Sequence, residues 1–281
     1  MNKKYVVAVS GGVDSVVLLH QLVMAGEYEL IVAHFDHGIR SDSAEDARFV
    51  AGLAAQYNLP FTTDREELGV SASEEQARSR RYGFLRAMAE RYEATIVTAH
   101  HADDVIETIA INVRRGTGWR GAAVLDSPTV VRPLLQMTKR QIRDYALEHR
   151  LEWVEDNTNA SGRYLRNRLR HKLCYAPSAK KQALHAIRHR QLELKKAIDE
   201  EVSKYIQQKE HSRYFFVQID TQTAVELLRA IVVVAVMQSP TRPQLVRGLL
   251  AIKTARPGTS YEMGGSVTLH FTKRTFIVET P

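Results

Sequence analysis

Short apolar runs alternate with longer amphipathic stretches over the first half of the chain. The runs Lys4–Val9, Glu29–Phe35 and Thr95–Ala99 are too continuously apolar to leave one face in water, which predicts buried strands of a parallel sheet. The other stretches carry apolar residues at spacings of three and four, which predicts helices. The predicted helices are Asp14–Ala25, Ser43–Tyr57, Ser73–Tyr92, Asp103–Arg114 and Lys139–His149, and Ser73 with Gln76 resembles a capping box. This order predicts a doubly wound α/β fold.

The pattern changes in the second half of the chain. A long basic helix is predicted over Lys180–Gln208, and two more helices over Thr221–Met237 and Arg242–Thr254. Short strands are predicted at Phe215–Ile219, Ser260–Met263, Ser266–Phe271 and Thr275–Glu279. We therefore expect a catalytic domain over residues 1–176 and a smaller, largely helical α+β domain over 177–281. The expected core residues are Trp153, Phe215, Phe216, Phe271, Phe276 and the aliphatic stripe from Val225 to Val236.

Composition narrows the class of protein. The chain has 281 residues, of which 44% are hydrophobic and 25% charged, as in ordinary globular proteins. Its longest apolar stretch, Ala230–Met237, is far shorter than the ~20 residues of a membrane span, so no membrane association is expected. The single cysteine, Cys174, excludes an internal disulfide, a four-cysteine zinc site and chemistry that needs two thiols. A cytoplasmic protein is expected.

The net charge of +7 is unevenly distributed. Residues 161–212 hold 13 Lys and Arg against 5 Asp and Glu, whereas residues 1–160 are net acidic. Such a density predicts a surface that faces phosphates, and a solvated helix face is the alternative. Eleven of these 13 basic residues lie between residues 163 and 196, namely Arg163, Arg166, Arg168, Arg170, Lys172, Lys180, Lys181, Arg188, Arg190, Lys195 and Lys196.

A glycine-containing loop, Ser10-Gly11-Gly12-Val13-Asp14-Ser15, follows the first predicted strand and opens the first predicted helix. Glycines allow a tight turn, and the exposed N–H groups of a helix start attract anions, so the loop predicts a phosphate-binding site. A plain strand-to-helix turn is the alternative. The Walker pattern is absent from the chain.

Further polar motifs lie where the carboxyl ends of the strands are expected to gather. These motifs are Asp36-His37-Gly38-Ile39-Arg40, Glu75-Gln76-Ala77-Arg78, His100-His101-Ala102-Asp103-Asp104 with Glu107, Arg115-Gly116-Thr117-Gly118, Arg132-Pro133-Leu134-Leu135 and Arg166-Asn167-Arg168 with Arg170.

Each motif also has a structural alternative. Asp36 can hold a strand-ending turn, and Asp103, Asp104 and Glu107 can complement a helix dipole. Arg115 can be a plain surface arginine. A structural zinc site is disfavoured, because adjacent side chains diverge and no cysteine ligand accompanies the histidines.

The loop resembles the PP-loop of the N-type ATP pyrophosphatases, which adenylate a substrate and release pyrophosphate. The ordered series of motifs, over about residues 5 to 172, resembles the tRNA(Ile)-lysidine synthetase family. This resemblance implies an adenine nucleotide alpha hydrolase-like fold, ATP and Mg²⁺ as cofactors, and free lysine and a tRNA(Ile) with a CAU anticodon as partners. A homodimer is compatible with it.

The resemblance also implies roles for residues. The loop residues Ser10, Gly11, Gly12, Asp14 and Ser15 hold the phosphates of ATP, and Arg115 assists. The carboxylates of Asp36, Asp104 and Glu107 bind the amine of lysine and accept its proton, and Asp36 or Asp104 also carries magnesium. Contacts to tRNA are expected from Arg78, Arg166, Asn167, Arg168, Arg170, Arg188 and Arg190. Two alternatives stay open, namely another PP-loop ATP pyrophosphatase that modifies tRNA, and a non-catalytic nucleotide-dependent RNA-binding protein.

Overall fold

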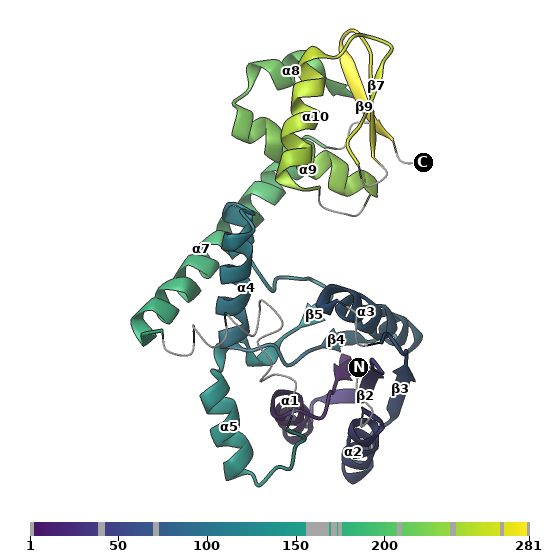
Figure 1. Cartoon of the computed structure of the whole chain (residues 1–281), viewed down its shortest axis with the longest axis vertical. Coiled ribbons are helices and arrows are strands. Elements are labelled where there is room, and N and C mark those ends of the chain that lie inside the picture. The colour runs from purple at the N-terminus through teal and green to yellow at the C-terminus, as the bar shows by residue number, and fades with distance from the viewer. Residues whose placement is uncertain are drawn as a thin grey trace. The chain divides into compact units, whose positions relative to one another are not determined.

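The protein is represented by a computed structural model, which describes residues 3–38, 43–69, 73–155, 169, 173, 176–206, 210–236, 240–264 and 267–279. The chain divides into two compact units (Figure 1). The first comprises Met1–Arg114 and Val124–Ala186, and the second comprises Arg115–Ala123 and Ile187–Pro281. The predicted boundary between residues 176 and 177 stays a prediction.

The first unit is built on a five-stranded parallel sheet with the strand order β3-β2-β1-β4-β5. This sheet confirms the predicted doubly wound α/β fold. The edge strands β3 and β5 were not predicted, because they are too short or too polar to form continuous apolar runs in the sequence. The strands are β1 (Lys3–Ala8), β2 (Tyr28–Asp36), β3 (Phe61–Arg65), β4 (Thr95–Val97) and β5 (Val130–Val131).

Both faces of the sheet are covered, as the apolar runs predict. Because side chains alternate along a strand, Tyr5 and Val7 of β1 face one cluster of the core, whereas Val6 faces another. Helices α1 (Val13–Ala25), α2 (Ser43–Gln56) and α5 (Lys139–Glu148) contribute to the first cluster. Helix α3 (Glu74–Arg91) contributes to the second, and Figure 1 shows it on the opposite side of the sheet from α1 and α2.

Two further parts of the first unit frame the carboxyl edge of the sheet. Helix α4 (Ala102–Arg114) packs through Val105 and Ile109 on Val124, with Leu184 of α7 (Ser178–Ser203) beside them. The short 3-10 helix η2 (Pro133–Gln136) leads into α5.

The strand order places a topological switch point beside β1. From β1 the chain builds β2 and β3 on one side, and β4 and β5 on the other. Connections leave β1 and β4 in opposite directions, so a crevice forms outside their carboxyl ends, where ligands bind in open α/β sheets. The loop after β1 and the segment Thr98–His101 after β4 both lie at this point.

The second unit combines helices with a four-stranded antiparallel sheet of order β6-β9-β8-β7. Its core contains Leu228 and Val232 of α9 together with Phe271 and Phe276 of the sheet. The predicted α+β character is confirmed. The elements that follow α7 are β6 (His211–Ser212), α8 (Arg213–Gln218), α9 (Thr221–Val236), α10 (Arg242–Thr254), β7 (Ser260–Glu262), β8 (Thr268–Phe271) and β9 (Thr275–Glu279), and the 3-10 helix η1 (Trp119–Ala122) belongs to the same unit.

The predicted strand Phe215–Ile219 is wrong, because these residues lie in and directly after helix α8. The hydroxyl of Ser212 accepts a hydrogen bond from the backbone N–H of Phe215 and so caps the helix. The helix buries Phe216 but leaves Phe215 42% exposed, so Phe215 is not a core residue. A short apolar run cannot be assigned to strand or helix by its periodicity alone.

Trp153 is half-buried rather than fully enclosed, and it packs against the first unit's core. No described helix combines the length and the apolar character that a bilayer span requires.

Candidate active site

The loop after β1 has the geometry of a phosphate cradle. Gly11 has a φ of +92°, a left-handed conformation that favours glycine, and Gly12 caps α1 without a side-chain hydrogen bond. The Ser15 hydroxyl braces the loop, because it donates to the carbonyl of Gly12 at 2.9 Å and accepts from the N–H of Ser10 at 3.2 Å. The first N–H groups of a helix have no partner within the helix, so the start of α1 offers donors to an anion.

Asp14, the second residue of α1, is paired with a lysine from a distant helix. The Nζ atom of Lys139 lies 2.6 Å from both carboxylate oxygens of Asp14. The imidazole Nε2 of His101 lies 3.9 Å from Asp14 Oδ2. The loop after β1, the end of β4 and the start of α5 thus meet at one place.

The start of α4 brings two acidic residues of the sequence motif into the interior. Asp104 and Glu107 are both buried. Asp104 Oδ2 accepts a hydrogen bond from the backbone N–H of His101 at 2.9 Å, and His101 Nε2 lies 3.5 Å from the same oxygen. The helix-capping role that the sequence offers as an alternative is confirmed for Asp104.

Asp103 points to a different set of partners. Its Oδ2 accepts from the backbone N–H of Lys139 at 2.8 Å, and its Oδ1 lies 3.1 Å from Lys181 Nζ. Burial acts to raise the pKa of Asp103, but the hydrogen bonds from Lys139 and Lys181 together outweigh it, so the pKa lies below its usual value. Asp103 therefore remains a carboxylate and ties α4 to α5 and α7.

Asp36 ends β2 and is almost fully buried. Its Oδ1 accepts from the N–H of Gly38 at 2.9 Å, its Oδ2 accepts from the hydroxyl of Ser43 at 3.1 Å, and Arg65 Nη1 lies 3.5 Å away. Gly38 has a φ of +60°, and a Cβ there would lie only 2.8 Å from the Cα of Glu67. The strand-ending turn is confirmed, and a catalytic or metal-binding role of Asp36 stays a proposal.

Two histidines at this edge are held neutral. Burial lowers the pKa of His100 to about 3, and the nearby charges of Arg78, Arg132 and Arg81 lower it further while Asp104 opposes them. Burial, with Arg81, lowers the pKa of His37 to about 4. Neither His100 nor His37 therefore carries a positive charge near neutral pH.

Arg78 lies on α3, half-buried, with its guanidinium carbon 4.8 Å from the centre of the Tyr82 ring. Its effect on the pKa of His100 places it on the α3 side of the same edge.

The remaining predicted residues belong elsewhere. Arg115, Arg188 and Arg190 are part of the second unit, Arg115 at the start of the segment Arg115–Ala123 and the other two on α7. The predicted tRNA contacts Arg166, Asn167, Arg168 and Arg170 lie outside the described residues.

Sequence reasoning missed Lys139 as a site residue and considered Lys181 only as part of the basic stretch. One signal was available for both. Each lysine lies in the first turn of its helix, where the helix dipole disfavours a cation. A lysine at such a position indicates a nearby anion, but which anion it meets depends on the tertiary fold.

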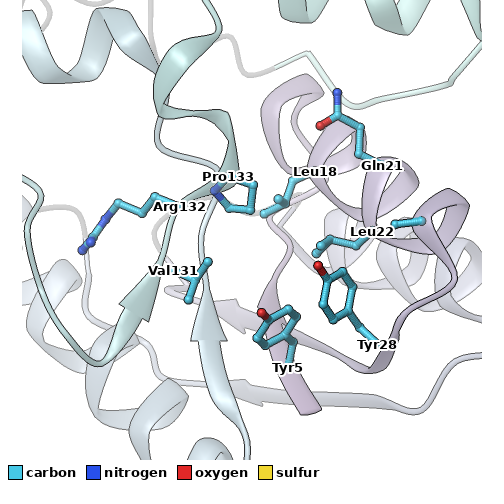
Figure 2. Close-up of a pocket in the computed structure, with 9 residues that line it drawn as sticks. Tyr5, Leu18, Gln21, Leu22, Tyr28, Val131, Arg132 and Pro133 are labelled. Carbon is cyan, nitrogen blue, oxygen red and sulfur yellow. The ribbon is translucent and has the colours of Figure 1, made fainter. Parts of the chain in front are cut away.

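A cavity of about 400 Å³ lies between α1, the starts of β1 and β2, and the segment Val131–Pro133 (Figure 2). Helix α1 runs antiparallel to β1, so its last turn, with Leu22 and Ala25, lies near the amino end of the sheet, where Tyr5 and Tyr28 complete the wall. Figure 2 shows the Arg132 guanidinium directed away from the other lining side chains. The cavity is mainly apolar and lacks the loop, so it is not the candidate nucleotide site.

Among the described residues, no three His, Cys, Asp or Glu side chains gather as metal ligands. A magnesium ion that accompanies a nucleotide needs fewer protein ligands, because the phosphates and one or two carboxylates hold it. Asp104 fits this role as a buried carboxylate in the first turn of α4. Asp36 fits on condition that its bonds to Gly38 and Ser43 rearrange.

The chain is similar to proteins of known name over this same part. It is 40% identical over 172 residues to the tRNA(Ile)-lysidine synthase of Solibacter usitatus (strain Ellin6076), which covers 59% of this chain and 39% of that protein. It is 41% identical over 173 residues to the tRNA(Ile)-lysidine synthase of Exiguobacterium sibiricum, with 59% and 42% covered. The chain thus spans less than half the length of these curated relatives.

A solved structure shows the same fold. The U34-tRNA thiolase NcsA from Methanococcus maripaludis aligns with a TM-score of 0.58 at 16% identity, over 69% of this chain and 72% of that one. A family model described as the PP-loop domain matches residues 1–176, which include the loop, both buried carboxylates of α4 and Lys139. The chain therefore belongs to the PP-loop domain family.

Proposed function

We propose that this chain is a tRNA-modifying PP-loop enzyme that joins free lysine to carbon 2 of the wobble cytidine in a tRNA(Ile) with a CAU anticodon. In the first step, the oxygen on carbon 2 attacks the α-phosphate of ATP, and pyrophosphate leaves. In the second step, the ε-amine of lysine displaces AMP from that carbon. The product reads AUA instead of AUG, and the tRNA accepts isoleucine instead of methionine.

One observation carries this proposal. The phosphate-binding loop and the buried carboxylates of α4 share one edge of the sheet, with His101 Nε2 3.9 Å from Asp14 Oδ2 and 3.5 Å from Asp104 Oδ2. The edge therefore combines anion-binding donors with acids that suit a cationic amine. The names of the similar proteins supply the tRNA and the lysidine product.

Adenylation is assigned to the loop. Backbone donors from Gly11 and Gly12, and the braced hydroxyls of Ser10 and Ser15, stabilise the charge that develops on the leaving pyrophosphate. Arg115, on its glycine-containing segment, is the proposed additional cation. When bound, Mg²⁺ neutralises part of the phosphate charge.

Lysine transfer is assigned to the carboxylates. Free lysine is mostly an ammonium ion at neutral pH, with a reference pKa of ~10.4, so the site must bind a cation and remove a proton before or during attack. Asp104 and Glu107 are one turn apart on α4 and both buried, which places two acids on the same helix face. Asp36, at the end of β2, is the third proposed acid.

The first experiment measures incorporation of labelled lysine into a CAU-anticodon tRNA. Incorporation is expected only with ATP and Mg²⁺, because both steps depend on adenylation. Incorporation without ATP contradicts the proposal. Exchange of label between pyrophosphate and ATP in the presence of tRNA is expected of the enzyme but not of a non-catalytic RNA-binding protein. When lysine is omitted, the adenylation step is measured separately from lysine transfer.

A second experiment divides the carboxylates between the steps. Asp104→Asn and Glu107→Gln are expected to raise the lysine requirement about tenfold or more, because a charged hydrogen bond to the ammonium contributes roughly 1.5–3 kcal/mol. Adenylated tRNA should still accumulate. If both variants instead fail at adenylation with unchanged lysine dependence, the two acids belong to the magnesium site.

A third experiment tests the basic residues. If Arg188 and Arg190 contact tRNA phosphates, the double alanine variant should reduce the slope of log affinity against log salt by somewhat under two units. Phosphate contacts carry no sequence information, so binding of isoleucine and methionine tRNAs should weaken equally. An unaltered slope indicates a solvated face.

A further inference from the structure

Lys139 is held at both ends by the proposed active site. It is the first residue of α5, and its backbone N–H donates to Asp103 Oδ2 at 2.8 Å. Its side chain ends at Asp14, with Nζ 2.6 Å from each carboxylate oxygen. Lys139 therefore connects the start of α5 to α4 through its backbone and to the phosphate-binding loop through its ammonium.

Helix α5 does not need this lysine for its own stability. Thr138 and Gln141 form a complete capping box at its start, and Ile142 and Ala146 anchor its apolar face in the core. A cation in the first turn is unfavourable with respect to the helix dipole. The presence of a lysine at this position is therefore explained by the contacts of its ammonium group and not by the stability of α5.

The ammonium meets a carboxylate at the place where phosphates are expected. Asp14 lies within the loop, and a carboxylate next to phosphate oxygens is repelled unless a cation lies between them. The Lys139 side chain is 39% exposed, so its ammonium can be reached from solvent. An ammonium has three N–H donors, of which Asp14 accepts two.

We propose that Lys139 is a binding residue for the pyrophosphate part of ATP. In the nucleotide-free protein its ammonium neutralises Asp14. When ATP binds, the ammonium contacts the phosphate oxygens, and the Asp14 carboxylate becomes available to the divalent cation that accompanies them. The proposal rests on the loop being the ATP site, which is part of the proposed function, but it does not depend on tRNA or lysine.

The test measures binding of inorganic pyrophosphate to the full chain by calorimetry. Lys139→Met is expected to weaken binding about tenfold or more, because a hydrogen bond from a charged donor contributes roughly 1.5–3 kcal/mol. Lys139→Arg should retain most of the affinity. Arg140→Met is the matched control, since it removes one positive charge from the same helix turn on a side chain that is 90% exposed.

A second readout separates ligand binding from a structural role. Lys139→Met leaves Asp14 without its ammonium, so Mn²⁺ should bind the nucleotide-free protein more tightly in this variant than in the wild type. If Lys139 had only a structural role, Lys139→Met would weaken the binding of both pyrophosphate and Mn²⁺ and would lower the unfolding midpoint. The proposal stands if pyrophosphate binding weakens while Mn²⁺ binding tightens, and it is overturned if either change is absent.

Failure of the proposed function gives a different result. A protein that binds pyrophosphate through Lys139 but never incorporates lysine into tRNA would overturn the lysidine reaction and leave the assignment of Lys139 intact.

Discussion

The two compact units each contain a group of two acids and two cations, and the groups differ in architecture. In the first unit, Asp14, Lys139, Asp103 and Lys181 form an open chain of contacts, which we call the lysine chain. In the second unit, each arginine of a closed group contacts both acids, and we call this group the arginine ring. The ring consists of Arg120, Asp199, Glu226 and Arg229.

In the arginine ring, each arginine pairs with both acids of the ring. Arg120 lies 2.8 Å from Glu226 and 2.9 Å from Asp199, and Arg229 lies 3.1 Å and 2.9 Å from the same acids. The Arg229 side chain is only 13% exposed. Planar guanidinium groups suit such a multidentate arrangement.

The lysine chain differs because its cations end in single ammonium groups at helix starts. Lysine is a flexible point charge with donors that can change partner, and Lys139 is three times as exposed as Arg229. The arginine ring and the lysine chain thus have the same formal charge but different roles. The ring fastens Arg120, and with it the segment that begins at Arg115, to α7 and α9, whereas the lysine chain is suited to exchange its partners with an incoming anion.

The largest expected difference is in stability. Arg120→Ala removes one of the two arginines that contact each acid of the ring, and it should lower the free energy of unfolding of the second unit by about 2–3 kcal/mol. Lys139→Met should change that of the first unit by less than about 0.5 kcal/mol, because exposed ion pairs contribute little.

The two tryptophans allow this test, since Trp119 lies in the second unit and Trp153 in the first. Urea unfolding is followed by fluorescence in a Trp153→Phe background for the ring and a Trp119→Phe background for the chain. Arg190→Ala, on an exposed side chain, is the control for the ring. Equal losses for Arg120→Ala and Lys139→Met would remove the distinction between ring and chain.

An intermediate effect is expected from acid. His100 has a pKa of about 3 when folded, against a usual value near 6.5, so between these values the unfolded chain binds more protons and stability falls as pH falls. Lowering the pH from 6.5 to 5 should reduce the free energy of unfolding of the first unit by about 1–2 kcal/mol through His100 alone.

Urea unfolding at both pH values measures this acid sensitivity. His100→Gln should remove part of it, although His37, with a folded pKa of about 4, retains the rest. His189→Gln, at a 75% exposed side chain of the second unit, is the control variant. An identical pH dependence in wild type and His100→Gln would show that His100 is not held neutral.

The smallest effect is expected at the end of the lysine chain. Lys181→Met removes one of the two hydrogen bonds that hold the pKa of Asp103 down, so that pKa should rise toward its usual value, as measured by NMR titration of the carboxyl carbon. The folded pKa is depressed, so the stability that Asp103 contributes is present above the unfolded pKa and declines as pH falls. Stability at pH 7 should change by less than about 0.5 kcal/mol. An unmoved Asp103 pKa would show that the backbone N–H of Lys139 alone maintains it.

Local chemistry made part of the site predictable. The loop Ser10–Ser15 combines glycines with hydroxyls directly after an apolar strand, and the phosphate cradle depends on that local order. Buried carboxylates after β4 were predictable for the same reason, since strand ends of a parallel sheet gather at one edge. Phe215 shows the limit of such local reasoning. Its burial depends on whether Ser212, three residues earlier, caps a helix or continues a strand.

The sequence by itself determined the doubly wound fold, the position of the phosphate loop and the acids of α4, because periodicity and turn chemistry act between near neighbours. Only the tertiary structure decided which cation forms an ion pair with Asp14. Lys139 lies 125 residues away in sequence, and the two meet because α1 and α5 pack on the same face of the sheet. Charge pairing across such a separation depends on how helices are stacked, which no local pattern specifies.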